Sequence, residues 1–255
     1  MNGKNSVSMI ADIFYIATGV YKSYFEEFLK TLPNFLPGWE KRIIVVTDDY
    51  NYFNEYRRNR TTLYIYEQID LPYPIIPLLK THYISLYAPE DAEYIFYFDA
   101  DTRFLKKSDE FWKEFIADID RGDIVVSNHP ANLYPQYKIA EDSKAYIPEG
   151  AFYFPIIASC YGGRADKVLE LCEQMCGMIR HDLTTHGPEG ERHYIPPLFD
   201  QDYLTKCVYN SDGLSFRVRY FVHIDWLHNE HDVDEENIVE QKYDVSRKFE
   251  KKNMV

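Results

Sequence analysis

Short apolar runs alternate with amphipathic stretches over the first half of the chain. Runs rich in β-branched and aromatic residues predict strands at 10–17, 42–47, 63–66, 93–98 and 123–127. Apolar positions at helical spacing predict helices at 21–32, 77–87 and 111–119. Strands that alternate with helices in this way predict an α/β fold, in which a mostly parallel central sheet is flanked by helices.

The pattern is less regular after residue 128. Residues 129–151 are rich in Pro, Asn and Tyr, which predicts a long surface loop of the kind that often carries function. Further strands are predicted at 152–161 and 216–224, and further helices at 166–179 and 203–208. Residues 182–193 are polar and expected to be mobile, and the chain from 229 onward is charged and poor in apolar residues. With no internal repeat or low-complexity linker, residues 1–228 are predicted to form one domain with a weak boundary near residue 130, followed by a tail of residues 229–255.

The composition is that of a globular protein with an excess of aromatic rings. Hydrophobic residues make up 45% of the 255 residues and aromatic residues 16%. Rings suit a cleft for sugars and bases because they offer flat apolar faces, although core packing explains most individual tyrosines equally well. The formal net charge of −13 repels a phosphate backbone and argues against a nucleic-acid partner. A nucleotide can still bind where a cation and local donors cancel its diphosphate charge.

Two further features bear on compartment. No run approaches the roughly 18 apolar residues of a membrane span, and residues 1–9 lack the apolar core of a secretory signal. We therefore expect no transmembrane segment and a cytoplasmic protein, with a chain trimmed of its anchor as the alternative. Cys172 and Cys176 lie four apart on a predicted helix, so they are expected to be core thiols rather than a disulfide or a zinc pair.

The candidate chemistry begins where the fourth predicted strand ends. Asp99 and Asp101 directly follow the apolar run 93–98, and ligands of parallel sheets bind outside the carboxyl ends of the strands. Two carboxylates separated by one residue can share one Mn²⁺ or Mg²⁺ ion and leave positions open for phosphate oxygens. The alternative is a simple break between strand and turn, with Asp101 capping the next turn of the chain.

A phosphatase of the haloacid-dehalogenase type also carries an Asp-X-Asp pair after an apolar strand. Two details argue against it. Such enzymes have Thr or Val four positions after the first Asp, where this chain has Arg103, and their motif usually lies on the first strand, whereas here about ninety residues precede it. A carbohydrate-binding module without catalysis is the third possibility.

Several segments, taken together, point to one family. Residues 14–21 read Phe-Tyr-Ile-Ala-Thr-Gly-Val-Tyr, residues 143–150 read Ser-Lys-Ala-Tyr-Ile-Pro-Glu-Gly, His129 is followed by Pro130, and Gly162-Gly163 follow Phe152-Tyr153. The chain resembles the retaining glycosyltransferases of family 6, the group of the ABO blood-group and α-1,3-galactosyl transferases and small bacterial relatives. The resemblance covers residues 10 to 225. It implies a GT-A type nucleotide-diphospho-sugar transferase fold, with a nucleotide-binding half at 10–130 and a donor-sugar and acceptor half at 131–228.

The resemblance also implies the partners. A UDP-sugar would donate galactose or N-acetylgalactosamine to an oligosaccharide acceptor with Mn²⁺ or Mg²⁺ as cofactor. The residues implied to face the nucleotide and its diphosphate are Tyr15, Ile16, Ala17, Thr18, Tyr21, Lys80, Asp99, Ala100 and Asp101. Tyr21 corresponds to a tyrosine that stacks near uracil, and Lys80 to a basic residue of the donor site, although a helical lysine that points to solvent is equally expected. Those implied to contact the sugar or acceptor are His129, Glu149, Ser159 and Gly162.

The chain departs from the family at residues 200–203. Family 6 has His-Asp-Glu-Ser, with the Glu as nucleophile or stabiliser of the oxocarbenium ion, whereas this chain reads Asp-Gln-Asp-Tyr, so Asp202 takes the place of the Glu. We expect Asp202 to be the catalytic carboxylate, with Gln201 or Asp200 next, and Asp200 as a helix cap as the alternative. Because Asp is one methylene shorter than Glu, stabilisation of an ion pair is favoured over covalent attack. The Asp-Gln-Asp string also resembles family 8, in which a downstream His completes the metal shell. His223 or His228 is the candidate for that ligand.

Overall fold

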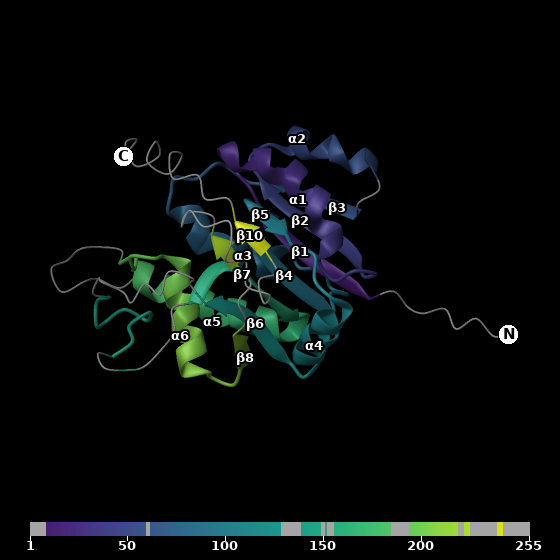
Figure 1. The fold of residues 1–255 in the computed structure, drawn as a ribbon. Helices are drawn as coiled ribbons and strands as arrows, with labels where there is room; N and C mark the ends of the chain where they lie inside the picture. Colours follow the sequence, from purple (N-terminus) through teal and green to yellow (C-terminus); the bar gives the residue numbers. More distant parts are fainter. Residues whose placement is uncertain are drawn as a thin grey trace.

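A seven-stranded sheet forms the centre of the protein (Figure 1). The computed structural model describes residues 9–59, 62–128, 139–148, 151, 156–184, 194–218, 222–224 and 239–241. The strand order is β3-β2-β1-β4-β7-β6-β8. The bounds are β1 Ile10–Ile16, β2 Glu40–Thr47, β3 Thr62–Glu67, β4 Tyr94–Asp99, β6 Asp123–Asn128, β7 Ile156–Arg164 and β8 Ser215–Val218. Only β7 runs antiparallel to its neighbours, so the predicted mostly parallel sheet is confirmed.

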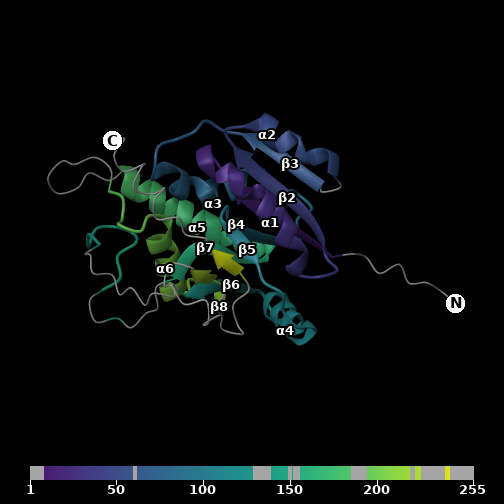
Figure 2. The same ribbon diagram turned by 45° about the horizontal axis from the view of Figure 1, so that its top comes forward.

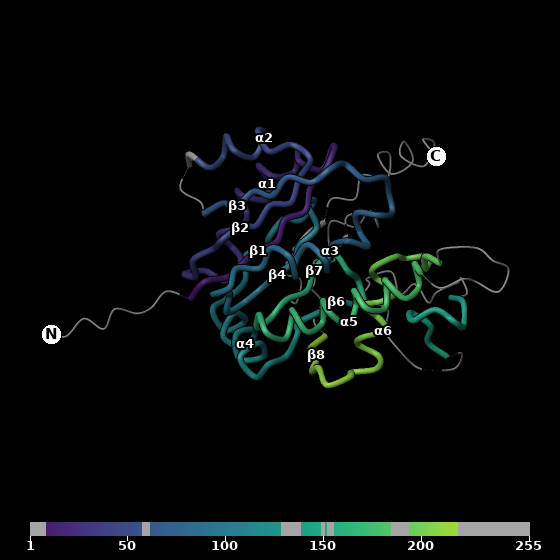
Figure 3. Tube along the Cα trace, turned by 180° about the vertical axis from the view of Figure 1, so that it is seen from behind, coloured from purple at the N-terminus to yellow at the C-terminus, as the bar shows by residue number. Residues whose placement is uncertain are grey.

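Helices cover both faces of this sheet. Successive side chains of a strand point to opposite faces, and β1 shows the consequence. Ala11, Ile13 and Tyr15 pack against α1 (Phe25–Thr31) and α4 (Asp109–Asp120), on one face. Phe14 and Ile16 face the side of α3 (Ile75–Tyr87), α5 (Ala165–Thr184) and α6 (Asp200–Asn210). Seen from behind, α5 and α6 lie side by side (Figure 3).

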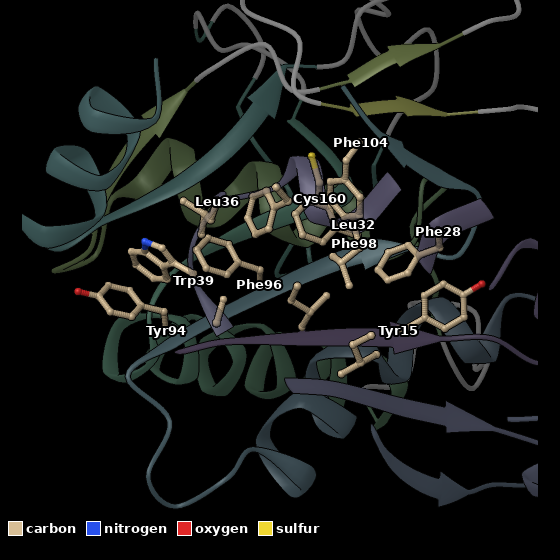
Figure 4. Close-up of a cluster of buried hydrophobic side chains, with 14 of the residues drawn as sticks. Tyr15, Phe28, Leu32, Leu36, Trp39, Tyr94, Phe96, Phe98, Phe104 and Cys160 are labelled. Carbon is tan, nitrogen blue, oxygen red and sulfur yellow. The ribbon is translucent and has the colours of Figure 1, made fainter. Parts of the chain in front are cut away.

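The first of these faces is packed mainly by aromatic rings (Figure 4). At one end Tyr15 lies 4.7 Å from Phe28 between ring centroids, and at the other Trp39 lies 4.8 Å from Tyr94. Aromatic pairs at these distances stabilise a core beyond the area that they bury. The excess of rings in the sequence is thus used largely for packing along the length of the sheet.

Several element bounds differ from those predicted. The predicted helix 21–32 is a 3₁₀ helix, Gly19–Tyr24, followed by the short α1, because Gly19 takes a φ of +56° that begins a turn. The helix predicted at 166–179 begins at Ala165 and extends to Thr184, so Asp182 to Thr184 are helical; residues 185–193 lie outside the described residues. The pattern did not predict α2 (Tyr50–Asn54) or the 3₁₀ helices Leu32–Asn34 and Tyr56–Asn59, which are too short for a clear periodicity.

A second, three-stranded sheet lies beside the first (Figure 2). It consists of β5 (Thr102–Phe104), β9 (Val222–Ile224) and β10 (Val239–Gln241), in the order β5-β10-β9. The predicted strand 216–224 therefore corresponds to two strands, β8 and β9, in different sheets. Residues 239–241, in the predicted tail, pair with β5 immediately after the acidic pair.

Two expectations from composition are answered by the described residues. None of their helices is long and apolar enough to span a bilayer. All four cysteines are free, and Cys172 is buried while Cys176 is half-buried, as expected of thiols on the inner face of a helix.

Candidate active site

The candidate site lies at the edge of the sheet where the parallel strands end. β1, β2 and β4 end there: Thr18 and Asp48 follow the first two strands, and Asp99 is the last residue of β4. The chain enters α3 and α6 there as well, α3 shortly after the end of β3, and α6 with Asp200 as its first residue. Ligands of open parallel sheets bind at this edge, so the topology brings residues from the whole chain to one place.

A charged cluster, formed by Lys80, Asp99 and Asp200, is the centre of this edge. Nζ of Lys80 lies 2.9 Å from Oδ1 of Asp99 and 3.0 Å from Oδ2 of Asp200. The side chains of Lys80 and Asp200 are 11% and 8% exposed, whereas that of Asp99 is 31% exposed. Lys80 therefore does not point to solvent: it joins two carboxylates that are far apart in sequence.

The electrostatics of this cluster follow from its burial. Burial raises the pKa of Asp200 to about 6, although Lys80 acts to lower it, and Asp99 raises it further. Burial alone would lower the pKa of Lys80, but Asp200 and Asp99 outweigh it and hold that pKa above its ordinary value. Lys80 is thus a permanent cation.

One oxygen of the cluster is held by Lys80 alone. Oδ2 of Asp200 is buried and lies 3.0 Å from Nζ of Lys80, and the described residues supply no further donor to it. A carboxylate oxygen can accept more than one hydrogen bond, so this atom at the strand-end edge is suited to a ligand hydroxyl as well. Asp200 does not cap its helix: Phe199 occupies the cap position, and no side chain caps there.

The acidic turn, residues 99–101, is held from beneath by two tyrosines. The hydroxyl of Tyr15 donates to the carbonyl of Ala100 at 3.2 Å, and the hydroxyl of Tyr97 donates to Oδ1 of Asp99 at 2.5 Å. Burial, followed by the charge of Asp99, raises the pKa of Tyr97 well above its usual value, so this hydroxyl remains a donor. The Tyr15 side chain is fully buried and supports the turn from the core, while Asp101 stands half-buried between β4 and β5.

The loop after β1 is fixed by an aspartate after β2. Both carboxylate oxygens of Asp48 accept from the backbone N–H of Gly19, at 3.0 and 3.1 Å. Ile16, Ala17 and Thr18 are buried just before this contact, and Tyr21 is half-buried in the 3₁₀ helix. The predicted nucleotide-facing segment is therefore a preformed turn beside the acidic turn.

The predicted catalytic triplet divides into distinct roles. Asp200 joins the charged cluster, whereas Oδ2 of Asp202 accepts from the backbone N–H of Leu198 at 2.8 Å. Burial raises the pKa of Asp202 to about 6, against the Leu198 N–H, which lowers it. Gln201 is half-buried between them. The structure therefore brings Asp200, and not Asp202, to Lys80 and Asp99.

The predicted sugar contacts on β7 differ in their surroundings. Ser159 is 5% exposed, and its hydroxyl has no hydrogen-bond partner within the described part of the chain. It lies where the pairing with β6 shifts, between Val126 and Ser127. Gly162 lies within the sheet, where a Cβ would come 2.2 Å from Cδ1 of Phe96, so the close approach of that ring accounts for this glycine.

Four predicted residues remain beyond this description. His129, Glu149 and His228 lie outside the described residues. The backbone of His223 lies in β9, opposite Glu240 of β10, which in turn pairs with Arg103. His223 is therefore carried by the small sheet that continues from the acidic turn, but its side chain lies outside the described part.

The donor set suits a cation that arrives with a phosphate ligand. Within the described ranges no three His, Cys, Asp or Glu side chains are grouped so as to hold a metal by themselves. Asp99 and Asp101 would supply two hard oxygen ligands, the number with which Mg²⁺ is commonly bound beside substrate phosphates. The chemistry of the acidic turn therefore fits a shared cation better than a protein-only cage.

Two supporting residues were not predicted. Tyr97 lies two positions before Asp99 and so shares its side of the strand. This relation could have been predicted from the alternation of side chains along a strand. Asp48 follows β2 directly, and Asp99 closes β4, so both stand where an apolar run of the sequence ends. Their specific contacts depend on the packing of neighbouring strands.

The protein is an α/β protein with an open, mostly parallel sheet, and a lysine and carboxylates lie at the edge where proteins of this architecture bind ligands. No family model matches the chain. The chain is similar to the O-antigen biosynthesis glycosyltransferase WbnI of Escherichia coli, with 27% identity over 216 residues, or 81% of this chain and 85% of that protein. The protein is thus a distant homologue of a bacterial glycosyltransferase, which favours the transferase over the phosphatase.

Proposed function

We propose that this protein is a metal-dependent, retaining glycosyltransferase of GT-A type, which transfers a hexose from a UDP-sugar to a glycan acceptor. Galactose or N-acetylgalactosamine is the proposed sugar, and an O-antigen glycan is the proposed class of acceptor. The charged cluster of Lys80, Asp99 and Asp200 carries the proposal, because it combines a permanent cation with a buried carboxylate at the strand-end edge. The distant transferase relative supports it.

The diphosphate would lie over the acidic turn and the loop after β1. Asp99 and Asp101 would hold Mn²⁺ or Mg²⁺ together with the phosphate oxygens, and His223 is the proposed third ligand. Such a cation neutralises the charge that develops on the leaving diphosphate. Lys80 lies between the acidic turn and Asp200, so its charge is available to the same leaving group without any change in protonation.

The sugar would lie between the diphosphate and the start of α6. Oδ2 of Asp200 can accept a hydrogen bond from a sugar hydroxyl in addition to its contact with Lys80. The negative charge of Asp200 stabilises positive charge at the anomeric carbon. Ser159 is the proposed contact with the sugar from β7, because its hydroxyl has no hydrogen-bond partner among the described residues. Because Asp200 is already paired with Lys80, stabilisation of an ion pair is favoured over covalent capture.

Calorimetric titration with UDP, with Mn²⁺ and then with EDTA, tests the donor site. We expect binding that depends on Mn²⁺ and is weakened at least about tenfold, or 1.4 kcal/mol, by Asp101→Asn. Asp166→Asn is the matched control, because Asp166 is an exposed aspartate beyond the end of β7 at the opposite edge of the sheet. It should bind UDP as the parent does.

A donor screen then separates the remaining functions. Slow hydrolysis of one UDP-hexose, with release of UDP, supports a transferase. Failure to bind UDP with or without Mn²⁺ would overturn the proposal, and release of inorganic phosphate from phosphomonoesters would support the phosphatase. Tight binding of UDP without turnover of any UDP-sugar would indicate a binding module.

A further inference from the structure

The chain makes a strained turn just before α6. Phe199 has φ +55° and ψ −121°, values of the first central position of a type II′ turn, where glycine predominates. The backbone N–H of Gln201 donates to the carbonyl of Leu198 at 3.1 Å, which closes the turn. A side chain in this region of φ is strained and persists only when its surroundings hold it.

Asp202 is one of the groups that hold this turn. Its Oδ2 accepts from the N–H of Leu198 at 2.8 Å, across the turn that Phe199 makes. The N–H of Phe199 donates in turn to the carbonyl of Pro196 at 3.0 Å. The carboxylate of Asp202 is therefore a bridge between the first turn of α6 and the segment that enters it.

An aromatic contact holds the same turn from another element. The rings of Tyr73 and Phe199 meet edge to face, with 4.9 Å between centroids and an angle of 84°. Tyr73 lies two residues before α3, which carries Lys80, and Phe199 immediately precedes Asp200. The contact thus joins the starts of the two helices whose charged side chains meet in the cluster.

We propose that Asp202 is a positioning residue, which braces the strained turn 198–201 so that Asp200 faces Lys80 and the substrate, and that Asp202 itself takes no part in bond making. The proposal rests on the transferase function above and gives Asp202 a role other than that of the catalytic carboxylate expected from the sequence. The two aspartates of the Asp-Gln-Asp string then have different tasks, one electrostatic and one structural.

The two carboxylates differ in the way that this division requires. Asp200 is paired with a cation across the cluster, whereas Asp202 is 6% exposed and its Oδ2 is engaged by a backbone donor. A movement of the Asp202 carboxylate toward a substrate would break the hydrogen bond that its Oδ2 accepts from Leu198 at 2.8 Å. Because the turn is strained, that release would also free Asp200 from its position.

Two substitutions at position 202 separate bracing from reaction. Asp202→Asn keeps an oxygen that can accept from Leu198 but removes the charge, whereas Asp202→Ala removes both. If Asp202 braces the turn, kcat for the best UDP-hexose should stay within about tenfold of the parent in the Asn variant. It should fall about a hundredfold in the Ala variant, since small misplacements of a catalytic group cost that much. Affinity for UDP should be unchanged in both.

The outcomes are decisive in each direction. A loss of kcat beyond tenfold in Asp202→Asn would mean that the charge of Asp202 is needed. Equal turnover in the two variants would mean that the hydrogen bond to Leu198 is not needed. Either result overturns the proposal. Asp212→Ala, an exposed aspartate just beyond the other end of α6, is the matched control and should behave as the parent does.

Hydrogen exchange reads the brace without any turnover. The amide of Leu198 should be protected in the parent and in Asp202→Asn, and should exchange at least about tenfold faster in Asp202→Ala, because only that variant lacks an acceptor. Equal exchange in the three proteins would overturn the brace even if the parent turned over no UDP-sugar, which is the separate failure of the proposed function. If Asp202→Ala is too unstable for kinetics, Asp202→Asn carries the test. The Asn variant must then show both the protection of the Leu198 amide and the turnover of the parent.

Discussion

Two buried charge clusters lie at opposite edges of the same sheet, and they are built differently. At the amino edge Asp12 and Arg42 are direct neighbours on β1 and β2, and the guanidinium binds both oxygens of Asp12, at 2.6 and 2.8 Å. At the carboxyl edge Lys80 spans Asp99 and Asp200, with a single contact to each carboxylate. Two parallel hydrogen bonds hold the pair of the first cluster, whereas each acid of the second has one contact with the lysine.

The second acid of each cluster shows the same contrast. Asp91 also pairs with Arg42, at 2.7 Å, but its side chain is 73% exposed, so solvent carries much of its charge. In the other cluster both acids are buried or half-buried around a single lysine. The bidentate pair at the amino edge favours stability, whereas the carboxyl edge, where one lysine is shared by two acids, keeps acceptor capacity for a ligand.

The largest expected effect is on turnover, at the carboxyl edge. Asp200→Asn should lower kcat about 10³-fold, or about 4 kcal/mol, because it removes the negative charge that faces the sugar. The free energy of unfolding at pH 7 should not fall, because the raised pKa of Asp200 means that its ionised form costs the fold free energy that a neutral amide does not. Donor hydrolysis and urea denaturation measure the two quantities. A loss of stability larger than the loss in kcat would remove the contrast between the clusters.

Asp12→Ala should have the opposite profile. It leaves Arg42 buried with only the exposed Asp91, so we expect the free energy of unfolding to fall by about 3 kcal/mol, the lower end for a broken buried pair. The kcat of the folded protein should stay within about twofold of the parent, because this edge does not contact the substrate. Urea denaturation with donor hydrolysis at 10 °C tests both, and a selective loss of kcat would contradict it.

The pH dependence of stability sharpens the comparison further. Since the pKa of Asp200 is raised to about 6, the folded protein holds this proton more tightly than the unfolded chain, where the group titrates near 3.8. The bound proton stabilises the fold below about pH 4, and that contribution is lost as pH rises through 6.

We therefore expect the free energy of unfolding of the parent, without divalent cation, to fall between pH 4 and 7 by about 2 to 3 kcal/mol relative to Asp200→Asn. Turnover should rise over the same interval as Asp200 ionises. Urea denaturation at a series of pH values measures the difference, and a difference that stays flat would show that Asp200 is not a buried acid in solution.

The smallest expected effect concerns the support beneath the cluster. Tyr97→Phe removes one hydrogen bond to Asp99 but keeps the ring, so we expect a loss of about 1 kcal/mol in the free energy of unfolding. Tyr94→Phe is the control, because Tyr94 lies on the same strand and donates to Asp120 instead. Differential scanning calorimetry measures this loss of stability. In a separate titration, identical weakening of Mn²⁺–UDP binding by the two variants would argue against a special role for Tyr97.

Most of the fold could be predicted from the sequence, because strands and helices of this size have clear periodicities. The strand-end position of Asp99 and Asp101 followed from the apolar run before them, and it is confirmed. What could not be predicted rests on short or non-local pairing: β5 and β10 have three residues each and are far apart in sequence. Such strands have no pattern long enough to detect.

The charged cluster shows the same limit. Nothing in the residues around Lys80 indicates that it is buried, since that depends on the packing of α3 against α5 and α6. The contact of Asp202 with Leu198 could not be predicted either. Asp200 and Asp202 lie two apart on a helix and point to nearly opposite sides, and periodicity alone does not set which of them faces the carboxyl edge of the sheet. By contrast, Asp12 and Arg42 each occupy the third position of their strand. Parallel pairing of the two strands in register would have predicted their contact.

The pairing of β10 with β5 bears on how the protein can be shortened or tagged. Residues 239–241 lie beyond the sequence-based boundary at 228, yet their backbone is hydrogen-bonded to the strand that leaves the acidic turn. A chain cut at residue 228 would turn β5 into a bare edge, open to pairing with another molecule. Residues 239–241 are therefore better kept in any shortened form of the protein, and an affinity tag is better placed at the amino terminus.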